Sequence, residues 1–162
     1  MEPGVFREVP AEIASYVVRV RRDGDPADLA SPAPIQGTVT RLRISRLPSF
    51  QRPRGVRIDV RTDDATLVRF HGSAATSALL SRAQFDGSGL LDALESVIGR
   101  ARLRNLGLDG HTVLLELADR TGYRGMTSWS PSTTRDADVF AVTALVNAFA
   151  AKFFAAPADG SW

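Results

Sequence analysis

Alternating apolar and polar residues between Thr38 and Phe70 limit the possible folds more than any other pattern in this sequence. Leu42 and Ile44, for example, fall on one side of an extended chain, while Arg41 and Arg43 fall on the other. A period of two predicts β-strands that bury one face and leave the other wet, as in an antiparallel meander. Three stretches of this region fit the pattern, Thr38–Ser45, Val56–Arg61 and Thr66–Phe70, and Tyr16–Arg22 before it alternates weakly and is predicted as a fourth strand.

The second half of the chain changes period. Residues 71–84 are small and polar, and we expect only one or two helical turns there. Apolar residues then recur at helical spacing over about 89–104 and again up to about Phe154. Between these helices we predict a β-hairpin from His111 to Trp129, with its turn at Asp119–Gly122. Thr133 and Asp136 have the spacing of a helix N-terminal capping box.

These elements predict an α+β fold, with an antiparallel sheet of about six strands and two main helices packed on one face. A length of 162 residues fits one domain. We assign residues 1–14 to a loose N-terminal lead-in, 15–156 to a single α+β domain, and 157–162 to a C-terminal tail.

Several kinds of chemistry lack the residues they need. The chain has no cysteine, which excludes disulfides and thiolate ligands. Its two histidines, His71 and His111, do not have the spacing of a metal site, and no serine lies in a nucleophile elbow. We therefore expect no metal, no cofactor and no catalytic residue.

Neither a secretion signal nor a convincing membrane span is present in the sequence. The most apolar stretch, 139–156, contains Thr143, Asn147 and Lys152 and is shorter than the about 20 residues that a span needs. We read it as a core helix and expect a cytoplasmic protein that does not enter a membrane.

A basic segment runs from Arg41 to Arg61. It holds seven arginines against one acidic residue, Asp59, in a chain whose net charge is only +2. Arg41, Arg43, Arg57 and Arg61 fall on the polar side of their strands, which makes them candidates for a basic face. Such a face either is simply solvated or binds a polyanion. We do not expect nucleic acid, because stacking aromatics do not accompany the arginines.

The predicted hairpin carries the second group of candidate binding residues. Glu116 lies among leucines, and a short turn would bring it within reach of Arg124 for a cross-strand ion pair. Tyr123 precedes Arg124, and Trp129 follows near the strand end. Tyr, Trp and Arg are enriched in binding hot spots, so these four residues form either a recognition surface or a structural salt bridge with packed aromatics.

The hairpin also carries a resemblance, over roughly residues 85–155. Asp109-Gly110, Glu116, Tyr123-Arg124 and Pro131, followed by an apolar helix, resemble a pattern in a group of uncharacterised bacterial α+β proteins. The order of sheet, helix and hairpin is also similar to that of small bacterial protease-inhibitor domains. Neither resemblance implies an activity or a site residue.

We expect a non-enzymatic protein-binding module of the inhibitor, immunity or accessory type, in an oligomeric state that the sequence leaves open. The first alternative is a small anionic-ligand-binding protein or enzyme that uses Glu116 as acid or base and Arg124 as the anion's partner. The second is polyanion binding through the arginine-rich sheet face.

Overall fold

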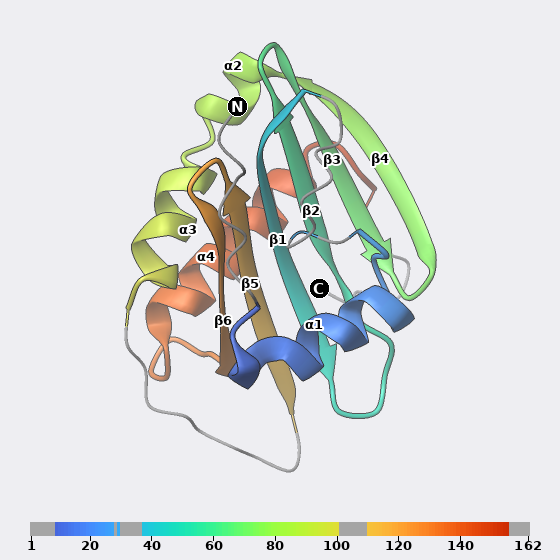
Figure 1. Ribbon diagram of the computed structural model, residues 1–162, viewed down its shortest axis with the longest axis vertical. Coiled ribbons are helices and arrows are strands. Elements are labelled where there is room, and N and C mark those ends of the chain that lie inside the picture. The colour runs from blue at the N-terminus through green and yellow to red at the C-terminus, as the bar shows by residue number, and fades with distance from the viewer. Residues whose placement is uncertain (1–8, 28, 30–36, 101–109, 156–162) are drawn as a thin grey trace.

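The computed structural model describes residues 9–27, 29, 37–100 and 110–155. Its centre is an antiparallel sheet of six strands in the order β4-β3-β2-β1-β5-β6 (Figure 1). The strands are β1 (Thr38–Pro48), β2 (Arg54–Arg61), β3 (Asp64–His71), β4 (Ala74–Ser81), β5 (His111–Asp119) and β6 (Gly122–Trp129). The helices are α1 (Ala11–Asp23), α2 (Arg82–Asp86), α3 (Leu90–Ile98) and α4 (Ala137–Ala150). The α+β class and the six-stranded antiparallel sheet are confirmed.

One predicted strand is a helix, and one strand was not predicted. Residues 16–22 belong to α1, which begins at Ala11 inside the expected lead-in. Ile13, Val17 and Val20 form its buried stripe, whereas Val18, which the strand prediction placed inside, is 57% exposed. A segment as short as residues 16–22 is compatible with both the strand period of two and the helical period of 3.6. The apolar stripe that identifies the helix begins before this segment, at Ile13. The sixth strand is β4, in the region expected to hold only helical turns.

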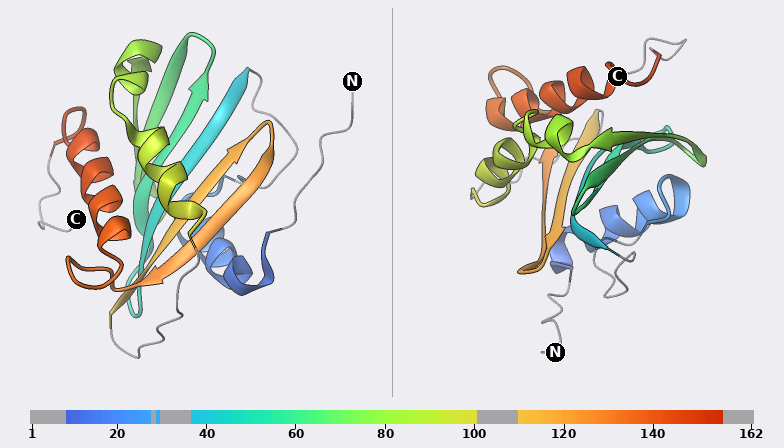
Figure 2. Two further views of the ribbon diagram at one scale, coloured as in Figure 1. Left: turned by 90° about the vertical axis from the view of Figure 1, so that its left-hand side faces the viewer. Right: turned by 90° about the horizontal axis from the view of Figure 1, so that it is seen from above.

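Helices cover both faces of the sheet, unlike the predicted arrangement on one face. Residues of α2, α3 and α4 pack in one cluster with Leu42, Ile58 and Leu115 of the sheet. Residues of α1 pack in a second cluster with Leu47, Leu114 and Tyr123. Figure 2 shows α1 on one side of the sheet and α3 and α4 on the other. The polar side of the central strands is therefore not wet.

The last helix, α4, buries one apolar stripe. Val139, Val142, Val146 and Phe149 are buried against the sheet. The capping box expected from Thr133 and Asp136 does not form, because the N-cap of α4 is Asp136 and it makes no side-chain cap bond. In the described part of the chain, no helix combines the length and the apolar character that a membrane span requires.

Candidate functional site

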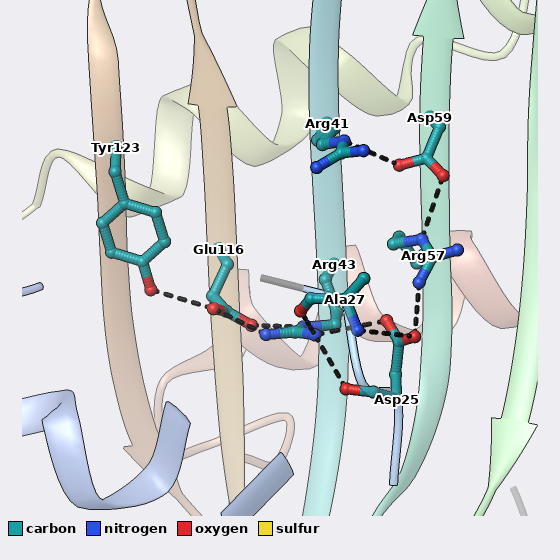
Figure 3. Close-up of polar contacts among 8 residues, drawn as sticks. All are labelled: Asp25, Ala27, Arg41, Arg43, Arg57, Asp59, Glu116 and Tyr123. Carbon is teal, nitrogen blue, oxygen red and sulfur yellow. Dashed lines mark hydrogen bonds and ion pairs between the residues drawn. The ribbon is translucent and has the colours of Figure 1, made fainter. Parts of the chain in front are cut away.

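A buried charge network lies on the same side of the sheet as α1, where an exposed arginine face was expected (Figure 3). Arg43 is its centre and is 0% exposed. Its Nε and Nη2 donate to the two carboxylate oxygens of Glu116, at 2.5 and 3.0 Å. Its Nη1 donates to a carboxylate oxygen of Asp25 at 3.2 Å and to the carbonyl of Ala27 at 2.8 Å. The guanidinium is thus saturated by a fork-to-fork pair and by the segment that follows α1.

The network continues from β1 to β2. Arg57 donates to both Asp25 and Asp59, and Arg41 pairs with Asp59 at 3.3 Å. Three arginines therefore face three carboxylates, and the charges balance within the layer. Burial alone would lower the pKa of Arg43, but the Glu116 and Asp25 carboxylates outweigh it and raise the pKa above its usual value.

The predicted basic face is therefore wrong as an exposed surface. Arg41 is 8% exposed and Arg43 is fully buried. Arg57 is bound to two carboxylates, and Arg61, which is half-buried, pairs with Asp64 at 2.5 Å. Asp59 and Asp64 are close in sequence to Arg57 and Arg61, with which they pair, whereas Asp25, after α1, and Glu116, on β5, are far away and reach this layer only through the fold.

The predicted pair of Glu116 and Arg124 is also absent. The hairpin turn places Glu116 opposite Gly125, so Arg124 projects to the other face of the sheet. There Arg124 donates to Asp119 at 2.7 Å and to Glu95 of α3 at 3.3 Å. Glu116 instead accepts a hydrogen bond from the Tyr123 hydroxyl at 2.9 Å.

The four hairpin residues consequently do not form one surface. Glu116 and Tyr123 are buried under α1, whereas Arg124 lies on the side of α3. Trp129 is half-buried at the strand end, and its ring packs against Gly110. Glu116, the residue considered as an acid or base, has no exposed surface, and Arg43 and Tyr123 occupy its carboxylate.

A pocket of about 460 Å³ lies on the opposite face, between α4 and the sheet. Its apolar lining comes from Ile44, Val113, Pro131, Phe140 and Ala144, and its polar lining from Arg46, Arg54, His111, Thr143 and Asn147. The sequence contained a signal for this site, because Arg46 and Arg54 continue the apolar sides of β1 and β2 and not the polar sides. The basic segment from Arg41 to Arg61 therefore divides between the two faces of the sheet.

His111 shows the strongest electrostatic effect in this pocket. Burial, together with the charges of Arg46 and Arg54, lowers its pKa from 6.5 to about 4. Its Nδ1 lies 3.3 Å from Nη2 of Arg46. Because a guanidinium can only donate, Nδ1 must accept, and the neutral ring carries its proton on Nε2.

The β1–β2 loop at this end of the sheet exposes an aromatic ring. Phe50 is 89% exposed, more than any other large apolar side chain among the described residues. The backbone around it is held firmly: Arg19 of α1 donates to the carbonyls of Pro48 and Gln51, at 2.6 and 2.9 Å. The amide of Ser49 donates to the carbonyl of Gly110 at 3.1 Å. The loop is therefore fixed while its aromatic side chain is free.

No group of three or more His, Cys, Asp or Glu residues that could hold a metal ion occurs within the ranges that the structure describes. Comparison of the chain with protein-family models, with curated proteins and with solved structures gives no match.

Proposed function

We propose that the chain is a non-enzymatic protein-binding module that docks an acidic protein surface on its β1–β2 loop. The observation that carries the proposal is Phe50, a large apolar side chain that is 89% exposed on a loop whose backbone is fixed. An aromatic anchor on a rigid support loses little entropy on binding, and such anchors dominate interface energetics.

The charges around Phe50 define the partner. Arg52 is exposed two residues away and has no ion pair with any described residue. Arg19 holds the loop, and Arg22 at the end of α1 is bound to Asp23. Val18, also exposed, precedes Arg19 on α1. This combination suits a partner with an apolar pocket for Phe50 and a rim of carboxylates, which would steer association.

The state of the potential catalytic groups supports binding over catalysis. Glu116 is sealed from solvent and saturated by Arg43 and Tyr123. The alternative built on Glu116 and Arg124 therefore lacks the shared cleft that it requires. Polyanion binding through Arg41, Arg43, Arg57 and Arg61 lacks the exposed charges that it requires.

Site-specific photo-crosslinking tests the docking proposal. A photoreactive phenylalanine analogue replaces Phe50 in one sample and Leu79, a 69% exposed residue of β4, in the control. In cells that produce the protein naturally, we expect position 50 alone to capture one defined protein. The captured protein, once purified, should bind Leu79→Ser as tightly as the wild type. It should bind Phe50→Ser and Arg52→Glu at least about tenfold more weakly.

Three results would overturn the proposal. These are capture of nucleic acid at position 50, equal capture of the same protein at both positions, and unchanged affinity of the purified partner for Phe50→Ser. Affinity that does not fall with salt would remove the acidic partner from the proposal, since charged rims are screened.

A further inference from the structure

We propose that the pocket between α4 and the sheet binds a small organic carboxylate, with the carboxylate between Arg46 and Arg54 and an apolar body against α4. The site is separate from the β1–β2 loop surface, and the inference does not depend on the proposed docking function. Its volume of about 460 Å³ lies within the about 300–1,000 Å³ typical of small-ligand sites.

The first argument is that two like charges face each other. Arg46 of β1 and Arg54 of β2 are direct cross-strand partners in the sheet register. Opposed like charges destabilise a strand pair. No carboxylate of a described residue lies within ion-pair distance of either guanidinium, although the same two strands pair Arg41, Arg43 and Arg57 with acids on the other face.

The second argument is unsatisfied hydrogen-bonding capacity. The Nε atoms of Arg46 and Arg54 are buried and have no hydrogen-bond partner in the structure. Burial, with the charge of Arg54 as the second cause, lowers the pKa of Arg46. Buried polar atoms without partners are uncommon, and each one requires an explanation. A bound anion that accepts from the terminal nitrogens of both side chains would offset their burial and their repulsion.

The lining defines the ligand. Planar guanidinium groups bind carboxylates with two parallel hydrogen bonds, which favours a planar headgroup. Phe140 and Ala144 of α4 and Val113 of β5 provide an apolar wall. His111 and Asn147 add polar groups, and the histidine is neutral, so it adds no further positive charge. A carboxylate with a short chain or ring therefore fits better than a fully polar ion.

Isothermal titration calorimetry with sodium hexanoate tests the site. We expect saturable binding on the order of 1 mM or tighter. Hexanamide, which has the same chain without the charge, and inorganic phosphate, which has charge without the chain, should each bind at least about tenfold more weakly. Arg54→Gln should weaken hexanoate binding about tenfold or more, as expected for loss of a charge-assisted hydrogen bond.

A matched pair of variants locates the ligand. Ala144 and Ala148 are both exposed on α4, but only Ala144 lines the pocket. Ala144→Leu should fill the site and abolish hexanoate binding, whereas Ala148→Leu should bind like the wild type. Leucine is a good helix former, so both variants should fold.

The bound carboxylate should also shift the His111 ring signals in nuclear magnetic resonance spectra, and hexanamide should not. Equal binding of hexanamide and hexanoate would overturn the carboxylate assignment. Equal binding of phosphate and hexanoate would overturn the apolar body. Unchanged binding to Ala144→Leu would overturn the location. None of these results would affect capture at Phe50, so the two proposals fail separately.

Discussion

Breaking the ion pair of Arg43 and Glu116 should be among the most destabilising changes available in this protein. In Arg43→Met, the Glu116 carboxylate stays fully buried with only the Tyr123 hydroxyl as a donor. Removing one partner of a buried pair costs about 3–5 kcal/mol, because the other charge is left uncompensated. In Glu116→Leu, Arg43 keeps Asp25 and the Ala27 carbonyl but loses its two shortest ion-pair bonds, and we expect a cost in the same range.

The double variant Arg43→Met/Glu116→Leu should cost less than either single change. Its losses are the hydrogen bond of Tyr123, the bond to the Ala27 carbonyl and one of the two ion pairs of Asp25, and we expect about 2–3 kcal/mol in total. Asp25 retains Arg57 and is not orphaned. The coupling between the two positions should therefore exceed about 3 kcal/mol, which is large for a double-mutant cycle.

Urea unfolding followed by tryptophan fluorescence measures these free energies. The exposed pair of Arg82 and Asp86, spaced i to i+4 on α2, is the control, and its removal should cost only about 0.3–0.5 kcal/mol. Additive single costs at Arg43 and Glu116, or single costs below about 1 kcal/mol, would show that the buried network is not a closed electrostatic unit.

Three further predictions follow from helix α1, the sheet and the pocket. In urea unfolding, Val17→Ala should lower the free energy of unfolding by about 2 kcal/mol and Val18→Ala by less than about 0.5 kcal/mol, because only Val17 is buried. A larger loss for Val18→Ala than for Val17→Ala would contradict the helical assignment of α1. Gly55→Ala should lower the free energy of unfolding by several kcal/mol or prevent folding, since a Cβ there would clash with the carbonyl oxygen of Ile44 in β1; a normal unfolding midpoint would contradict this packing. His111 should titrate near pH 4 by nuclear magnetic resonance, and Arg54→Gln should raise that pKa. Because the folded pKa lies below the usual 6.5, stability should fall as pH drops from about 6.5 to about 4, and His111→Asn should lack this component.

Strands were predicted correctly where apolar and polar residues alternate over a long segment. Five of the six strands coincide with predicted ones, and the hairpin from His111 to Trp129 was placed correctly. Strand β4 was missed because its alanines, serines and threonine show no apolar alternation, and five of its first six residues are exposed. Local pattern cannot identify such a strand, because pairing with β3 alone defines it.

The site residues were harder to predict, because alternation shows that two faces exist but not what covers them. Arg43 and Glu116 are 73 positions apart, and only the pairing of β1 with β5 brings them together. If residues 16–22 are taken as a strand, no helix covers this face of the sheet. The arginines on that face are then predicted to be exposed to solvent. By contrast, the separation of Glu116 from Arg124 was readable, since a two-residue turn fixes which hairpin residues share a face.

Alternate residues of a strand point to opposite faces of the sheet, and this separates the arginines of β1 and β2 into two groups with different surroundings. Arg41, Arg43 and Arg57 lie on the α1 side of the sheet, where Asp25, Asp59 and Glu116 balance their charge. Arg46 and Arg54 face α4 on the opposite side, where the cover is apolar and His111 is held neutral. A fold that needed arginines only for structure could have balanced both groups in the same way. The unbalanced group lies in the pocket, and this is the reason to look for an anion there and not on the buried network.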